Sequence, residues 1–531
     1  MRYGSVLSNL RSFGAAIAVS ASALGVASSA LAQEEPIYGP DPAEMISGGV
    51  LTVGSLVEPP ALDPFHQGAD ARIQVTTLIY QGLFYEGESG AIPLLATGYS
   101  VSDDGMSYTF TLREGVTFHT GQDMTAADVK YSYDYIRDPD NGSPGAGDFS
   151  TVESIDVIDD YTVVFNLNAP NASLPMTLGN KYGAVVPTGT FDDENARSAL
   201  NQQSVGTGPF QIATYEPNSF LELTAFDSYW QEGLPYLDGI TFLFLPNNAA
   251  LLVALRNERI DMAKLGRPQD AEQLEGADNL VIERWPSLGQ MPLDLDSNYG
   301  PLQDVRVRQA IALAIDKEEI LQASLGGYGT VIHTIVAGMQ DTWGVPVEEL
   351  EFQTQDLERA RALMAEAGLA DGVEMDLTTI AGFDWMDPAA VTLREQLSEI
   401  GITLNIQRVD LGVWIDNFRS RNMGLTFNEW ATQPDPNMLF FRHFHMAPEG
   451  ADFRNWNNEE ASALLRQGRS TSDFEERRAI YAEFQRELDR TVPTIMLFSA
   501  DIVTVANERV QNLYQHPTGW YFGLAKTQLA E

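Results

Sequence analysis

Hydrophobic residues recur with a period of two in the first half of the chain. Residues 107–115 alternate so that Tyr108, Phe110 and Leu112 share one face, which is typical of a half-buried strand. Residues 206–226 predict a pair of strands in a hairpin-like arrangement. Further strands are expected at residues 50–56, 160–168 and 239–246.

From about residue 300 the pattern changes to helices that alternate with strands. Asp304 is expected to cap a helix that buries Val307 and Ile311, and Asp356 to cap a second helix that ends at Gly368. Strands and helices then alternate, with short connections, through the segments 373–380, 388–401, 402–409, 411–421 and 425–430. This alternation predicts an α/β lobe with a largely parallel sheet.

The C-terminal part begins with a long helix and ends in strands. Ser472 and Glu475 have the spacing of a capping box before this helix, which carries Ile480 and Phe484 on one face. The strands expected at residues 494–498 and 502–506 must join sheets formed elsewhere. If they return to the first lobe, the domains are discontinuous.

The stretch Leu112–Ile136 is dense in polar and aromatic residues, yet each of them has a structural interpretation. Thr125 and Asp128 have capping-box spacing, and Val129, Tyr133 and Ile136 form the stripe that such a helix would bury. His119 is expected in the turn that precedes the helix.

The N-terminus has the three parts of a secretory signal peptide. Arg2 and Arg11 give a basic start, an apolar run covers residues 13–26, and Ala30 to Ala32 form an A-x-A cleavage pattern. Residues 1–32 are therefore interpreted as a signal peptide and residues 33–47 as a flexible lead-in. The chain has no cysteine, which excludes a lipid-anchored cysteine, disulfides and thiolate metal sites. We expect a periplasmic protein that is not a lipoprotein.

Net charge limits the range of partners. The chain carries 32 basic and 74 acidic residues, a formal net charge of −42, and such a surface repels nucleic acid and anionic lipid. Its length of 531 residues predicts two or three domains.

Motifs for catalysis are missing from the sequence. It contains no H-E-x-x-H, no G-x-x-x-x-G-K-[ST] and no G-x-S-x-G. His443 and His445 have a spacing that can serve two metal ligands on a strand, but two ordinary loop histidines are the favoured interpretation. We expect a protein that is not an enzyme and has no cofactor.

Two tryptophans follow predicted strands of the second lobe. Trp385 and Trp430 each lie just after a strand, and ligands of open α/β sheets collect at the carboxyl ends of strands. Both side chains are candidates for the wall of a pocket, with core packing as the alternative for each.

Seven segments stand out in order along the mature chain: "ALDPF" with "IYQGLF", "LREGVTFHTGQDMTAADVKYSYDYI", "GTGPFQIATYEP" with "DSYWQEGLPYLDGITF", "LRNERIDM", "DVRVRQAIALAIDKEEI", the helix at 357–368 and "ERRAIYAEFQRELDRTVPTIMLF". In this order they resemble the bacterial extracellular solute-binding proteins of family 5, the dipeptide/oligopeptide-binding type that serves ABC importers.

The resemblance implies a periplasmic binding protein-like α/β fold. Its two lobes are joined by a double-crossing hinge, and a small extra domain is inserted in the first lobe. On this chain the first lobe would comprise residues 48–82, 204–290 and 495–531, the inserted domain 83–203 and the second lobe 291–494. The stretch Leu112–Ile136 would then lie in the inserted domain, away from the ligand.

The resemblance also implies a ligand-binding segment around Trp430. Peptide-binding members have an aspartate three residues after this tryptophan, which pairs with the peptide's ammonium group. Here that position is Gln433, and an amide cannot neutralise a charge. Asp435 is the possible substitute, with a structural role in its Asp-Pro turn as the alternative.

We therefore predict the periplasmic receptor of an ABC importer, monomeric, which captures a peptide-like or other polar organic solute between its lobes and delivers it to membrane permease subunits. The alternatives are a non-peptide ligand (opine, oligosaccharide, glutathione or nickel chelate) and a secreted hydrolase that uses cleft carboxylates. The expected ligand-binding residues are Trp430, Gln433, Asp435, Trp385, Phe383, Arg442 and Glu58, with His443 and His445 as ligands of a metal chelate in the alternative.

Overall fold

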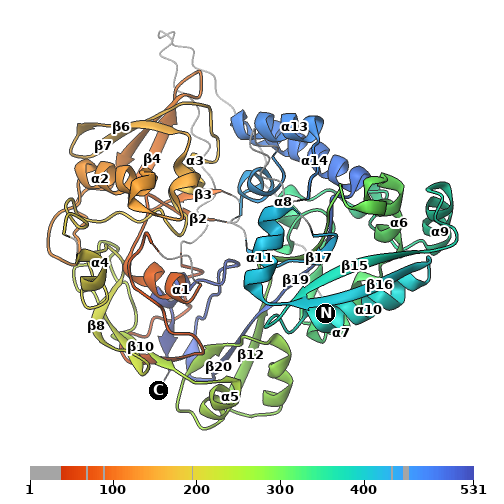
Figure 1. Cartoon of the computed structure of the whole chain (residues 1–531). Helices are drawn as coiled ribbons and strands as arrows, with labels where there is room; N and C mark the ends of the chain where they lie inside the picture. The colour runs from red at the N-terminus through yellow and green to blue at the C-terminus, as the bar shows by residue number, and fades with distance from the viewer. Residues whose placement is uncertain are drawn as a thin grey trace, which may run out of the picture. The chain divides into compact units, whose positions relative to one another are not determined.

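The computed structural model describes residues 38–66, 70–87, 90–193, 195–421, 423–431, 434–445 and 454–530. The predicted signal peptide lies outside these residues. Among the helices of the described part, none has the length and apolar character that a membrane span requires. Three main β-sheets organise the fold (Figure 1).

The first sheet has seven strands in the order β12-β20-β11-β1-β10-β9-β8. Strand β1 pairs in parallel with β10 and β11, whereas β8 and β9 form the predicted antiparallel hairpin. Helix α5 (Asn248–Arg256) and helix α1 (Asp70–Ile79) contact strands of this sheet. The strands are β1 (Val50–Ser55), β8 (Phe210–Glu216), β9 (Phe220–Ala225), β10 (Gly239–Phe244), β11 (Met262–Lys264), β12 (Leu280–Trp285) and β20 (Ile502–Asn507).

A second, antiparallel sheet of four strands lies within the predicted inserted domain. Its order is β4-β5-β7-β6, formed by β4 (Ala96–Val101), β5 (Ser107–Leu112), β6 (Val152–Asp159) and β7 (Thr162–Leu167). Helix α2 (Ala126–Arg137) contacts β6 and β7. The buried side chains of this sheet belong to the same hydrophobic core as those of β1, β9 and β10, so the insertion and the first sheet form one packed body.

Local structure in the stretch Leu112–Ile136 matches its prediction. The Asp128 carboxylate accepts a hydrogen bond from the backbone N–H of Thr125 at 2.9 Å, as a capping box requires. Val129, Tyr133 and Ile136 are fully buried. His119 is held by its ring Nε2, which donates to the Gly208 carbonyl at 2.9 Å. The stretch is structural in each of these respects.

The third sheet has the order β14-β19-β13-β17-β15-β16, with β18 paired to β13. Only β15 is parallel to its neighbours β16 and β17, whereas β13 is antiparallel to β17 and β19, so the prediction of a largely parallel sheet holds for one half. The strands are β13 (Gly289–Leu295), β14 (Gly329–Val331), β15 (Val373–Ile380), β16 (Ile402–Val409), β17 (Leu425–Phe427), β18 (Trp430–Ala431) and β19 (Thr494–Ala500).

Helices surround the third sheet and bury their apolar faces in two cores. Asp304 and Asp356 cap α6 and α9 as predicted. The capping residue of α14 is Asp473, whose side chain accepts from the Glu476 N–H at 2.9 Å, so the prediction of Ser472 was wrong by one position. The helices are α6 (Val305–Ala314), α7 (Lys317–Leu325), α8 (Gln340–Trp343), α9 (Leu357–Glu366), α10 (Met386–Ser398), α11 (Leu411–Ser420), α12 (Arg442–Phe444), α13 (Glu459–Ser470) and α14 (Phe474–Thr491).

The chain passes between the first and third sheets at two adjacent places. It leaves β12 of the first sheet and enters β13 of the third, and it later leaves β19 of the third sheet and enters β20 of the first. Because β12 pairs with β20 and β13 pairs with β19, the two connections, residues 286–288 and Asp501, run side by side. Two adjacent crossings are the geometry of a hinge between two lobes.

Two expected boundaries differ from the structure. Strand β19 pairs with β13 and β14 of the third sheet, so the return to the first lobe begins at Asp501 and not at residue 495. In the predicted lead-in, Tyr38 is buried and its hydroxyl lies 2.7 Å from that of Tyr229. The described part of the lead-in, residues 38–47, is therefore attached to the first lobe rather than flexible.

Candidate functional site

Trp430 lies beside the hinge. It forms β18, and in the pairing of β18 with β13 it stands opposite Gln290, next to the first crossing. Its indole stacks face to face on the His443 imidazole, with ring centroids 4.0 Å apart and planes at 4°. The Arg454 guanidinium lies 4.4 Å from the indole centroid. Trp430 is half-buried, so part of its surface is available to a solute.

A fully buried ion pair supports this stack. Arg454 Nε donates to Asp294 Oδ1 at 2.8 Å, and both side chains are at most 1% exposed. Asp294, on β13, also accepts hydrogen bonds from Thr494 Oγ1 at 2.8 Å and from Asn428 Nδ2 at 3.2 Å. The pair thus ties the segment that follows Trp430 to the crossing strand.

Asp435 is a second buried carboxylate with a cationic partner. Its two oxygens accept from Arg477 Nη1 at 2.8 Å and from Arg477 Nη2 at 2.9 Å, in a bidentate arrangement. Oδ1 also accepts from the backbone N–H of Asn437 at 2.8 Å and from the Ser173 hydroxyl at 3.0 Å. In this structure the charge of Asp435 is balanced by Arg477, which favours the structural interpretation over pairing with a solute ammonium.

Trp385 and Phe383 pack in the core of the second lobe. Trp385 is 5% exposed, its ring meets Phe427 and Phe498, and its Nε1 donates to Glu429 Oε2 at 3.0 Å. Phe383 is half-buried against the same core. The burial of Trp385 supports core packing, the alternative interpretation for this residue.

Glu58 is engaged by the first lobe. Its carboxylate accepts from the Tyr215 hydroxyl at 2.6 Å and from the Asn218 N–H at 3.0 Å. Burial and the hydrogen bond to Glu58 raise the pKa of Tyr215. Glu58 therefore orders the turn after β1 in this conformation.

The two candidate metal ligands stack on different partners. His443 stacks on Trp430, whereas His445 stacks on Phe441 at 4.2 Å. Burial, followed by the charges of Arg466 and Arg469, lowers the pKa of His445. Among the described residues, no three His, Asp or Glu side chains are grouped to hold a metal ion.

Gln433 lies outside the described residues, as does the side chain of Arg442. The chain that leads from Asp435 to α12 forms a π-helix, Asn437–Phe441, a rare conformation that is frequent at functional sites. Gln433 stands between Trp430 and this helix in the sequence, and its role in solute binding stays a prediction.

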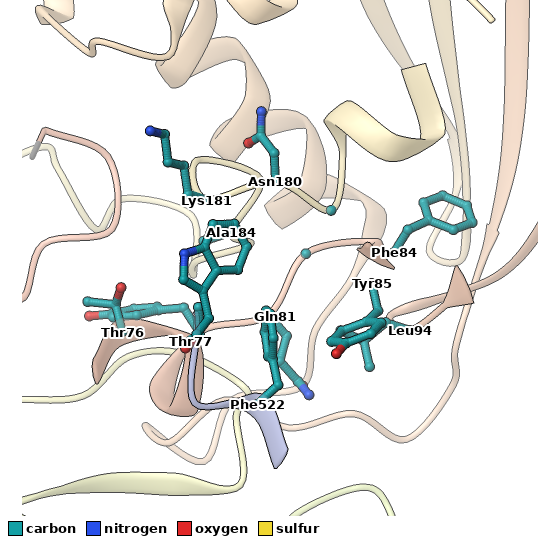
Figure 2. A pocket seen from close by; sticks show the side chains of 14 residues that line it. Thr76, Thr77, Gln81, Phe84, Tyr85, Leu94, Asn180, Lys181, Ala184 and Phe522 are labelled. Atoms are coloured by element: carbon teal, nitrogen blue, oxygen red, sulfur yellow. The ribbon is translucent and has the colours of Figure 1, made fainter. Parts of the chain in front are cut away.

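A recess in the first lobe adds residues that the sequence did not indicate. It contains about 400 Å³ of empty space, its opening included. Figure 2 shows Lys181 and Asn180 on one side and Tyr85 and Leu94 on another. Its remaining lining comes from α1, the short strand β2 (Phe84–Glu86), the segment around residue 180 and the C-terminal Trp520 and Phe522. These residues are far apart in sequence, so no local pattern connects them.

Two α/β bodies joined by adjacent crossings, with an aromatic cluster at the hinge, define the two-lobed class of extracellular solute-binding proteins. Residues 90–450 match the model of the bacterial extracellular solute-binding proteins, family 5. The match spans more than half of the chain, and the protein belongs to this family.

Curated relatives cover nearly the whole chain. The glutathione-binding protein GsiB of Salmonella typhimurium is 27% identical over 520 residues, which are 94% of this chain and 97% of the relative. The dipeptide-binding protein of Escherichia coli K12 is 25% identical over 463 residues, 82% of this chain and 86% of the relative.

Solved structures of similar fold agree with this. The ABC transporter substrate-binding protein CtaP of Listeria monocytogenes has a TM-score of 0.82 at 24% identity and covers 91% of this chain and all of its own. The periplasmic binding protein DppA of Helicobacter pylori, in complex with the peptide STSA, has a TM-score of 0.75 at 25% identity, with 92% and 99% covered.

Proposed function

We propose that the chain is the periplasmic receptor of an ABC importer, which captures a peptide-like or other polar organic solute between its lobes and passes it to membrane permease subunits. It is secreted by the signal peptide 1–32, acts as a monomer and performs no chemistry on its solute. The relatives that bind glutathione and dipeptides support this class of ligand.

The observation that carries the proposal is the position of the half-buried Trp430 beside the two crossings. A solute held there contacts the segment that moves least when the lobes swing, while both lobes close on it. The indole is held between the His443 imidazole and the Arg454 guanidinium, so its exposed edge is the apolar surface that it offers to an organic solute, with polar groups around it. Gln433 and Arg442 are proposed to add hydrogen bonds and a charge from the adjoining segment.

The ligand class follows from the charges near Trp430. Asp435 is paired with Arg477 and Gln433 is neutral, so neither of these two residues offers an unpaired negative charge to a free ammonium. Burying an unpaired cation is costly. We therefore propose a solute whose anchoring group is neutral or anionic, such as a blocked or modified peptide.

Mass spectrometry of the solute that co-purifies from the periplasm tests the function. We expect a small organic molecule, released on denaturation, that raises the melting temperature when it is added back. Products formed during incubation with a panel of peptides and glycans would instead indicate a hydrolase. Stabilisation by nickel with histidine alone would indicate a chelate receptor.

Replacing Trp430 with alanine is expected to weaken binding of the co-purifying solute by about 30-fold or more, as loss of a central aromatic contact does. Titration calorimetry measures the change. Trp414→Ala, a tryptophan in α11 whose Nε1 donates to Thr426, is the control for lost tryptophan packing within the second lobe. An equal loss of affinity in both variants would contradict a direct contact by Trp430.

A further inference from the structure

Contacts between the two lobes occur away from the hinge as well as at it. Ser173 lies between β7 and the short helix α3 (Leu174–Thr177), and its neighbours Leu174 and Leu178 belong to the core of the first lobe. Its hydroxyl meets Asp435 and Arg477, which lie with the third sheet and its helices. The adjacent Ala172 N–H donates to the Arg469 carbonyl at the end of α13, at 2.8 Å.

The Ser173 hydroxyl both accepts and donates a hydrogen bond in this contact. It accepts a hydrogen bond from Arg477 Nη2 at 2.7 Å and donates one to Asp435 Oδ1 at 3.0 Å. Ser173 is completely buried, and Asp435 and Arg477 are 3% and 7% exposed. Hydrogen bonds to charged groups in such surroundings are stronger than bonds between neutral groups.

Opening of the lobes would leave the charges balanced. Asp435 and Arg477 both belong to the second lobe, so their bidentate pair stays intact when Ser173 withdraws. When the lobes open, water must solvate only the neutral Ser173 hydroxyl and the side of the intact Asp435–Arg477 pair that Ser173 had covered. Separating two opposite charges would be far more costly. This arrangement suits a contact that is made and broken repeatedly.

We propose that Ser173 is a closure residue, whose hydroxyl docks on the Asp435–Arg477 pair and stabilises the closed form of the receptor. Asp435 thus acts in solute binding as a positioning residue that receives the first lobe, and not as a contact to the solute. This inference rests on the function proposed above, since it assumes lobes that open and close.

The absence of cysteine makes the test direct, because two introduced cysteines are the only labelling sites. Ile158→Cys on β6 and Val391→Cys on α10 place spin labels at positions that are 63% and 44% exposed, one on each side of the proposed contact. Pulsed electron paramagnetic resonance then gives the distribution of distances between the lobes, without a solute and with N-acetyl-alanylalanine, a blocked peptide, or free alanylalanine as probes.

Ser173→Ala is expected to reduce the ratio of closed to open molecules about tenfold, the effect of losing ~1.4 kcal/mol of closure energy. Arg477→Lys keeps the charge but cannot donate hydrogen bonds to Asp435 and Ser173 at the same time, so it is also expected to reduce the ratio of closed to open molecules. Arg267→Ala is the control, because it removes the exposed ion pair between Arg267 and Asp384, 3.6 Å long, which also joins the lobes. Exposed pairs contribute little, so its ratio should stay within about twofold of wild type.

An unchanged distance distribution in Ser173→Ala, with an unchanged melting temperature, overturns the proposal. A single open distance in the wild type under every condition overturns it as well, because the contact is then not made in solution. Failure of every probe to bind would count against the proposed function. The role of Ser173 is tested separately, by the ratio of closed to open molecules measured without a solute.

Discussion

Replacing Arg454 with methionine is expected to lower the free energy of unfolding by about 3–5 kcal/mol, the usual cost of breaking a buried ion pair. Methionine fills a similar volume but leaves the Asp294 carboxylate buried without its cationic partner. The bond from Arg454 Nη1 to the His443 carbonyl, 2.9 Å long, is lost too. The segment that carries His443 would then lose its attachment to β13.

Urea unfolding followed by tryptophan fluorescence measures this change. The control Arg361→Met removes an exposed pair with Glu399, 2.9 Å long, and should change the stability by less than about 1 kcal/mol. The double variant Arg454→Met/Asp294→Asn should recover part of the loss, because no uncompensated charge remains. A double variant less stable than Arg454→Met would contradict the role assigned to the charge of Asp294.

Local rules predicted the elements from the sequence because their causes lie within a few residues. Asp128 contacts the backbone of Thr125, three residues away, and the alternation that predicts β5 is internal to the strand. The α14 cap failed for a related reason: Ser472 and Asp473 are adjacent and both suit the position, so spacing alone could not decide between them.

Longer-range features could not be predicted from the sequence because they depend on which segments meet in space. Whether β19 continued the third sheet or returned to the first was decided by its pairing with β13, two hundred residues earlier in the chain. In the candidate site, Asp435 has one partner 42 residues away and another 262 residues away. No periodicity reveals such partners, and Trp385 was equally ambiguous between pocket and core until its contacts with Phe427 and Phe498 were known.

Glu86→Gln is expected to stabilise the protein at neutral pH. Glu86 ends β2, is completely buried, and neither of its carboxyl oxygens has a hydrogen-bond partner among the described residues. Burial raises the pKa of Glu86 well above 4.5, with the charge of Lys181 acting in the opposite direction and those of Asp148 and Asp435 reinforcing the rise. Glutamine has the size of the protonated acid and never ionises, so it removes the penalty.

The sign of the pH dependence follows from the protons bound. Above pH 4.5 the unfolded chain releases the Glu86 proton while the folded protein keeps it, so the wild type loses stability as the pH rises towards the folded pKa. Relative to wild type, the variant should gain about 1.4 kcal/mol for each pH unit in this interval. Equal stabilities at pH 4.5 and a difference that grows as the pH rises above it, in urea titrations at each pH, are the expected result.

Nearby His516 makes the comparison sharper because its effect has the opposite sign. Its Nε2 donates to the Glu86 carbonyl at 2.8 Å, while burial lowers its pKa to about 4. The unfolded chain binds the His516 proton first as the pH falls below about 6.5, so this histidine costs stability in acid. In the wild type the two effects oppose each other between pH 4.5 and 6.5, whereas in Glu86→Gln the histidine effect remains alone.

The variant's stability should therefore rise more steeply with pH than that of the wild type, and Glu114→Gln, at an exposed position, should follow the wild-type curve. Parallel curves for Glu86→Gln and wild type would show that the Glu86 carboxyl is ionised in the folded protein.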